Sequence, residues 1–178
     1  MLGMVFTELI EMVEEKFSPE IADQMVEAAE KEGGGAYTAV GAYPAEQVGV
    51  MVARLSELTG TPADELVRAF GRHLLTRFAQ SHPNHFARHP EVFDFLAHID
   101  SDIHVEVKKL YSNATLPRFK VLSRDADVMH LRYTSPRRLE TLATGLIEEL
   151  GAYAGQPLQV TAQSDDEGCT FVIRKAAA

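Results

Sequence analysis

The chain has 178 residues, 46% of them apolar and 24% charged, which suits one globular domain large enough to enclose a cofactor. Its formal net charge of −9 argues against nucleic acid or an anionic membrane as a partner, because both attract basic surfaces. A single cysteine, Cys169, excludes an internal disulfide and any zinc or iron–sulfur site built from several cysteines.

The amino-terminal part is predicted to be helical. Apolar residues recur at helical spacing, and Ser18-Pro19 and Thr61-Pro62 are typical helix starts. Three glycines at 33–35 are interpreted as a linker, since no strand precedes them and no Lys-Ser/Thr pair follows, as a phosphate-binding loop requires. The expected helices cover residues 2–17, 19–31, 44–59 and 62–78.

The next segment, residues 81–90, contains His82, His85 and His89, and the last two lie between Pro83 and Pro90. His85 and His89 share one face if the segment is helical, which is one arrangement for a metal site. No thiolate or acidic residue within the segment completes a ligand shell, so a loop at the edge of a pocket is the favoured interpretation. Another helix is expected over residues 92–99.

The stretch 100–119 is the centre of the functional prediction. Asp100 or Ser101 is a suitable cap for a helix whose apolar residues, Ile103 to Leu110, follow at helical spacing. His104 lies on the same face. A lone histidine beside an apolar stripe is compatible with a core histidine and with a metal ligand, and spacing alone does not decide between them.

From residue 118 the apolar period changes from helical to alternating. Strands are expected over 118–123 and 128–134, and again over 158–163 and 169–174, with a helix over 136–153 between the two hairpins. The fold class predicted is therefore α+β, with a helical amino-terminal subdomain and a carboxy-terminal antiparallel sheet of about four strands flanked by helices.

A second motif, Tyr-x-Ser-x-Arg, occupies residues 133–137. Side chains at alternate positions of an extended segment point the same way, and two hydroxyls and a guanidinium suit a carboxylate ligand. Two other interpretations stay open. Tyr133 is equally compatible with an inward-facing strand residue, and Ser135-Pro136 with an ordinary helix start that leaves Arg137 solvated.

Taken together, His104, the segment Ala114-Thr-Leu-Pro117-Arg and the motif at 133–137 resemble the bacterial heme–nitric oxide/oxygen binding (H-NOX) family, which is related to the heme sensor domain of soluble guanylate cyclase. The amino-terminal Met-Leu-Gly-Met-Val-Phe and the Phe70-Gly-Arg72 segment are similar to it as well. The resemblance implies one sensor domain over 1–178, with a helical part at about 1–65, a heme-bearing α+β part at about 66–178, and heme b buried between them.

The resemblance also implies roles for particular residues. His104 is the axial ligand of the heme iron, Tyr133, Ser135 and Arg137 hold the propionates, and Pro117 contacts the ring. The wall of the distal, gas-binding pocket comprises Val5, Leu74, Phe78, Leu142 and Leu146. In oxygen-binding members a tyrosine five residues beyond the motif's arginine donates to bound O2; Leu142 occupies that position and cannot donate, so we predict binding of NO and CO without a stable O2 complex.

By the same resemblance, NO breaks the iron–His104 bond and the signal passes to a separate protein such as a histidine kinase or a cyclic-di-GMP enzyme. No enzymatic motif is present, no apolar run is long enough to cross a membrane and the amino terminus lacks a basic region, so we expect a non-enzymatic, cytoplasmic protein. Three alternatives stay open: an O2 sensor of the same fold with a donor such as Tyr37 or His82, a heme-free binding domain for a small ligand, and an acid–base enzyme using His104.

Overall fold

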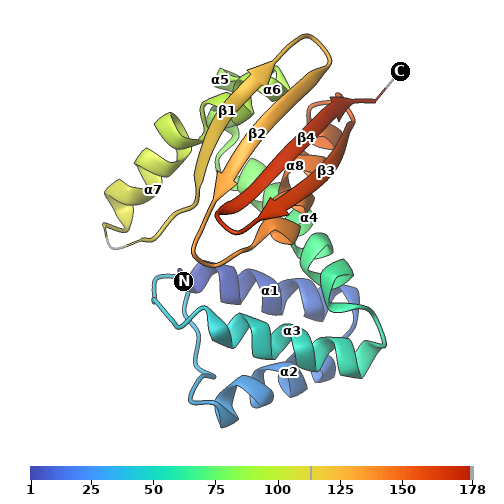
Figure 1. Cartoon of the computed structure of the whole chain (residues 1–178). Helices are drawn as coiled ribbons and strands as arrows, with labels where there is room; N and C mark the ends of the chain where they lie inside the picture. Colours follow the sequence, from blue (N-terminus) through green and yellow to red (C-terminus); the bar gives the residue numbers. More distant parts are fainter. Residues whose placement is uncertain (113, 177–178) are drawn as a thin grey trace. The chain divides into compact units, whose positions relative to one another are not determined.

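The computed structural model describes residues 1–112 and 114–176. Within these residues the chain forms eight α-helices, one π-helical turn (η1) and four strands (Figure 1). The elements are α1 (Gly3–Lys16), α2 (Pro19–Lys31), α3 (Glu46–Thr59), α4 (Ala63–Ser81), α5 (Pro83–Arg88), α6 (Val92–Ala97), η1 (Ile99–Ile103), α7 (His104–Leu110), β1 (Arg118–Arg124), β2 (Val128–Thr134), α8 (Glu140–Tyr153), β3 (Leu158–Asp165) and β4 (Gly168–Lys175).

The chain divides into two compact units, Met1–Phe70 and Gly71–Ala178. Helices α1 to α3 belong to the first unit, the sheet belongs to the second, and α4 begins in the first and ends in the second. This arrangement of helices followed by a four-stranded antiparallel sheet confirms the predicted α+β fold class. No helix among the described residues has both the length and the hydropathy of a membrane-spanning segment.

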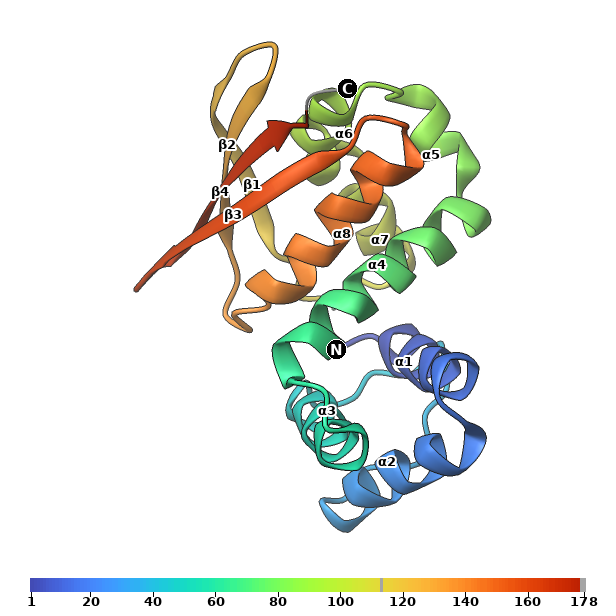
Figure 2. The ribbon, with the colours of Figure 1, turned by 90° about the vertical axis from the view of Figure 1, so that its right-hand side faces the viewer.

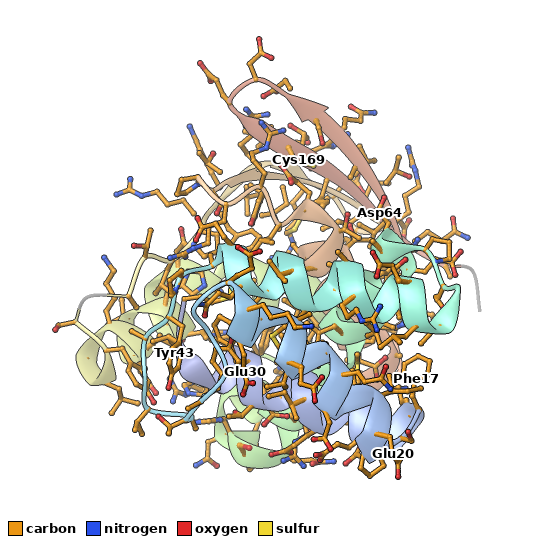
Figure 3. All side chains as sticks on the ribbon, turned by 90° about the horizontal axis from the view of Figure 1, so that it is seen from below. Phe17, Glu20, Glu30, Tyr43, Asp64 and Cys169 are labelled. Atoms are coloured by element: carbon orange, nitrogen blue, oxygen red, sulfur yellow. The ribbon has the colours of Figure 1, made fainter. Side chains whose placement is uncertain are left out.

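The first unit is held together by the apolar faces of its helices, which the spacing of the sequence predicts. The Ser18 hydroxyl caps α2 by accepting a hydrogen bond from the Ile21 amide at 3.3 Å, and α3 stops at Gly60, whose φ of 69° is one that glycine adopts without strain. Figure 3 shows Phe17 and Glu20 at the turn between α1 and α2, with Tyr43 and Glu30 toward the opposite end of this unit. The buried apolar residues of α1 to α3 are Phe6, Leu9, Met12, Val13, Ala22, Met25, Ala29, Met51, Val52 and Leu55, and Leu66 and Phe70 of α4 are buried as well.

The second unit is built on a sheet with the strand order β1-β2-β4-β3, in which every neighbouring pair is antiparallel. Alternate residues face one side, so one face of the sheet is apolar and buried. Helices α6 and α8 pack against that face, as Figure 2 shows. The buried residues of the two central strands are Met129, Leu131, Tyr133, Cys169, Phe171 and Ile173.

The structure departs from the sequence prediction around His104. A π-helical turn precedes α7, which starts at His104 itself, and neither predicted cap residue caps a helix. The Ser101 hydroxyl donates to the carbonyl of His98 at 3.2 Å, while Asp100 binds other partners. Leu110, predicted on the apolar face, is 76% exposed, because α7 ends there after two turns.

The start of α8 is also different from the prediction. The helix begins at Glu140, and residues 135–139 form an irregular turn, so the alternative in which Pro136 is the first helical residue is wrong. Arg138 has a φ of 50°, which interrupts any helix there. Its side chain is held by Glu140, at 2.6 Å from Nε, and by the carbonyl of Gly168.

Candidate functional site

His104 is fixed by a carboxylate one helical turn earlier. Its Nδ1 lies 2.8 Å from Oδ1 of Asp100. Because an ionised carboxylate only accepts hydrogen bonds, Nδ1 carries the proton and the lone pair of neutral His104 is on Nε2, where it is available to a metal. Burial lowers the pKa of His104 below its ordinary value, against the opposing effect of Asp100, and this favours the neutral imidazole that iron requires.

The second oxygen of Asp100 links His104 to the sheet. Oδ2 accepts a hydrogen bond from the Phe119 amide, in β1, at 2.9 Å. The Phe119 ring in turn lies 5.9 Å from the His104 ring and 5.3 Å from the Tyr133 ring, measured between centroids. The sequence prediction treated Asp100 as a helix cap and missed this role, although its position four residues before His104 was a usable signal.

Tyr133, Ser135 and Arg137 lie close together in the chain at the end of β2. Tyr133 is 2% exposed, and the hydroxyl oxygen of Ser135 accepts a hydrogen bond from the Arg137 amide at 3.2 Å. Burial raises the pKa of Tyr133, so its hydroxyl stays protonated and able to donate. Tyr133 is therefore both an inward-facing strand residue and a polar donor, and the two interpretations of the sequence do not exclude each other.

The guanidinium of Arg137 reaches the segment that contains Pro117. Its Nη1 donates to the carbonyl of Thr115 at 2.6 Å. A guanidinium has other N–H groups, and these do not take part in that hydrogen bond. Pro117 is half-buried, between α7 and β1. The structure thus brings the motif at 133–137 to the chain segment that follows His104, across more than twenty residues of sequence.

These residues form a donor set that fits an iron porphyrin. A neutral imidazole with its Nε2 lone pair free is a ligand for iron, and two hydroxyls and an arginine suit the carboxylates of a porphyrin. The hydrogen bond between Nδ1 of His104 and the Asp100 carboxylate is of the kind that orients ligating histidines in metal sites generally.

Leu74 and Phe78 lie on α4 and Leu142 and Leu146 on α8, all in the second unit. The two helices meet closely at Gly71, where an added Cβ would lie 2.3 Å from the carbonyl oxygen of Leu142. Leu74 is buried, and the other three are half-buried. All four side chains are hydrocarbons, so none of them donates a hydrogen bond.

Two further candidates lie in the first unit. Val5 is half-buried on α1, and its predicted role in the pocket wall stays a prediction. Tyr37, considered as a donor to bound O2, directs its hydroxyl to Oε1 of Gln47 at 3.2 Å, and its ring stacks on Phe6 at 4.5 Å between centroids.

The three histidines of 81–90 lie in or beside a short helix, α5, where a loop was predicted. Pro83 is well suited to a first helical position, which explains the start of this helix, and His82 is the residue before it. His85 pairs with Glu106, and His89 with Asp102, each at 3.0 Å. Over the described residues no three histidine, cysteine or acidic side chains are arranged to hold a metal ion.

Comparison with known proteins places the chain among heme proteins. A family model described as haem-NO-binding matches residues 2–162. No curated protein gives a match. Among solved structures, the Fe(II) unliganded H-NOX protein from K. algicida is 29% identical and superposes with a TM-score of 0.91, over 100% of this chain and 98% of that one.

Two other solved structures are similar and contain gaseous ligands. The H-NOX from Shewanella woodyi, in the Fe(II)CO state with IWP-051 bound, is 36% identical, with a TM-score of 0.84 over 99% of this chain and 95% of that one. An H-NOX protein from S. oneidensis in the Fe(II)NO state is 25% identical, with a TM-score of 0.89 over 99% of this chain and all of that one.

Proposed function

The chain belongs to the haem-NO-binding (H-NOX) family, and on this basis we propose that it is a heme-based gas sensor that binds NO and CO at ferrous iron and forms no stable complex with O2. The observation that carries the proposal is the geometry of His104, a partly buried neutral imidazole whose Nδ1 is held by Asp100 at 2.8 Å. The similar proteins from S. oneidensis and S. woodyi, in their Fe(II)NO and Fe(II)CO states, support the choice of ligands.

His104 is the proposed axial ligand, through Nε2. The heme, when bound, would supply a ferrous iron that binds a diatomic gas. Asp100 keeps the proton of His104 on Nδ1, so that the nitrogen facing the iron is the one with the lone pair.

The anchoring role is assigned to Tyr133, Ser135 and Arg137, which donate to the heme propionates. The hydroxyl oxygen of Ser135 is already held by the Arg137 amide, and the Tyr133 ring is buried, so less side-chain entropy is lost when the two residues bind a carboxylate. Pro117, in the segment that Arg137 holds through Thr115, is the proposed contact with the ring.

Selectivity between gases is assigned to the hydrocarbon side chains of α4 and α8. Bound O2 carries negative charge on its outer atom and gains stability from a hydrogen-bond donor, whereas NO and CO depend on one far less. Leu142 occupies the position where oxygen-binding relatives have a tyrosine, and it offers no donor. Leu74, Phe78 and Leu146 offer none either.

Signalling is proposed to start at His104. His104 would hold the heme iron, and loss of that bond on NO binding would release α7, which begins at this residue, from the constraint that the bond imposes. The proposed recipient of the signal is a separate signalling protein, such as a histidine kinase or a cyclic-di-GMP enzyme.

The test is the visible absorption spectrum of the purified protein, reduced without air and then exposed in turn to air and to NO. We expect a five-coordinate, histidine-bound ferrous heme that forms an NO complex and no O2 complex, and we expect His104→Gly to lose the histidine-bound spectrum. A stable O2 complex would instead assign the chain to O2 sensing. Failure to bind heme would leave a heme-free binding domain.

A further inference from the structure

Asp100 lies in a part of the backbone that ordinary helix geometry does not produce. It belongs to η1, the π-helical turn Ile99–Ile103 between α6 and α7. Turns of this kind occur often at functional sites, because the extra residue redirects neighbouring side chains. Here the turn brings a carboxylate beside a histidine on one side and beside a strand on the other.

The two oxygens of Asp100 have different partners. Oδ1 accepts from Nδ1 of His104 at 2.8 Å, and Oδ2 accepts from the amide of Phe119 at 2.9 Å. Phe119 is in β1, an edge strand, whose outward N–H groups have no strand partner. One carboxylate therefore satisfies a free edge amide and fixes the imidazole at the same time.

Phe119 also contacts Tyr133, one of the residues proposed to bind the propionates. Phe119 pairs with Tyr133 across β1 and β2, and their rings lie 5.3 Å apart between centroids. His104, Phe119 and Tyr133 thus form a continuous contact path from the proposed iron ligand to the proposed anchor, with Asp100 joining its first two members.

We propose that Asp100 is the positioning residue of the heme ligand: its carboxylate orients and strengthens His104 as a ligand and couples the position of His104 to strand β1. This inference rests on the proposed function, since His104 acts as a ligand only towards bound heme. Hydrogen bonds to a charged acceptor are stronger than neutral ones, and a ligating histidine that donates to a carboxylate is the more basic ligand. Asp100 thereby resists the loss of the iron–His104 bond that NO causes.

A purely structural role for Asp100 makes a different prediction. If the carboxylate served only to hold β1 through Phe119, its replacement would change the exchange of that amide and leave the iron–His104 bond as it was. Asp100→Asn separates the two roles, because a carboxamide has the same shape but no charge and a single acceptor oxygen.

The experiment measures the iron–His104 stretching frequency by resonance Raman spectroscopy on the full-length ferrous protein. It also measures the rate of iron–His104 cleavage after addition of NO, and the hydrogen exchange of the Phe119 amide in heme-free protein. Asp102→Asn is the matched control, since Asp102 lies in the same turn but binds His89, at 3.0 Å. Asp100→Glu, which keeps the charge one methylene further out, is a second variant in case Asp100→Asn folds poorly.

We expect Asp100→Asn to lower the iron–His104 stretching frequency and to accelerate cleavage of that bond by about 10–100-fold. Losing the hydrogen-bond partner of a ligating histidine usually weakens metal binding by such a factor. Asp100→Glu should fall between this variant and the wild type, and Asp102→Asn should match the wild type. A wild-type frequency and cleavage rate in Asp100→Asn, with only the Phe119 exchange altered, would overturn the inference while the proposed function stands. A wild-type protein without any iron–His104 band would overturn the proposed function itself.

Discussion

Leu142 is the residue on which the selectivity of the proposed sensor depends. It lies in the first turn of α8, half-buried, and its backbone carbonyl is in close contact with α4 at Gly71. The hydrocarbon side chain offers no hydrogen bond to a polar ligand, and this is the basis of the proposed discrimination against O2.

Replacing Leu142 by tyrosine should therefore stabilise an O2 complex. A hydrogen bond to a charged acceptor contributes about 1.5–3 kcal/mol, which corresponds to an affinity for O2 about 10–150-fold higher. The measurement is the O2 dissociation rate and affinity of the ferrous protein. Leu142→Phe is the control, because it adds the ring without the hydroxyl. Equal O2 affinity in the two variants would refute the role of Leu142.

Helices α4 and α8 approach each other closely at Gly71. A Cβ there would lie 2.3 Å from the Leu142 carbonyl oxygen and 3.0 Å from the Leu146 amide nitrogen. Both are backbone atoms, so the helices would have to separate to admit a methyl group. Two side-chain contacts from α4 to α8 support the same packing, namely Arg72 to Glu148 at 2.9 Å and Thr76 to Glu149 at 3.3 Å.

Gly71→Ala should destabilise the protein by about 1–3 kcal/mol, the usual cost of overpacking, despite the better helix propensity of alanine. The measurement is the free energy of unfolding from urea denaturation. Gly49→Ala is the matched control, since Gly49 is also inside a helix but has nothing within 4 Å of an added Cβ. We expect that substitution to stabilise by up to about 1 kcal/mol. Equal effects at the two glycines would contradict the close contact.

At the scale of the whole molecule, every residue proposed to ligate or anchor the heme belongs to the second unit. His104, Pro117 and the motif at 133–137 lie between residues 71 and 178. A ligand that binds the folded chain and not the unfolded one stabilises the fold in proportion to the logarithm of its concentration over its dissociation constant. Heme binding should therefore be measurable as an increase in the free energy of unfolding, independently of the absorption spectrum.

The heme-loaded chain should unfold at a higher urea concentration than the heme-free chain. Arg137→Gln should reduce the extra free energy of unfolding that heme provides, because the variant lacks the arginine donor proposed for the propionates. The reduction should be about 1.4 kcal/mol for each tenfold loss of affinity for heme. Arg174→Gln is the control, because Arg174 is exposed and lies one residue from buried Ile173, on the other face of the sheet. Arg137 would have no part in binding if both variants kept the full gain.

Much of the architecture could be predicted from local patterns. Helical spacing predicted the helices of the first unit, and alternation predicted both hairpins, because such patterns depend on which side of each element is buried. Residue chemistry made His104 and the motif at 133–137 candidates, since few side chains suit iron or a carboxylate, and the resemblance to the H-NOX family supplied their predicted roles. The helical and alternating patterns are properties of segments of about ten residues, and tertiary packing did not override them in these elements.

The features that the sequence did not predict depend on partners distant along the chain. Asp100 is a helix cap by local rules, yet it binds Phe119, nineteen residues later, through a π-helical turn. Pro136 is a helix start by local rules, yet Arg138 turns toward Gly168 and delays α8 to Glu140. The sequence by itself determined most of the helices and the four strands, because these follow from local patterns of burial. Only the tertiary structure decided that Asp100 binds Phe119 in β1, because a long-range hydrogen bond exists only once packing has brought its two groups together.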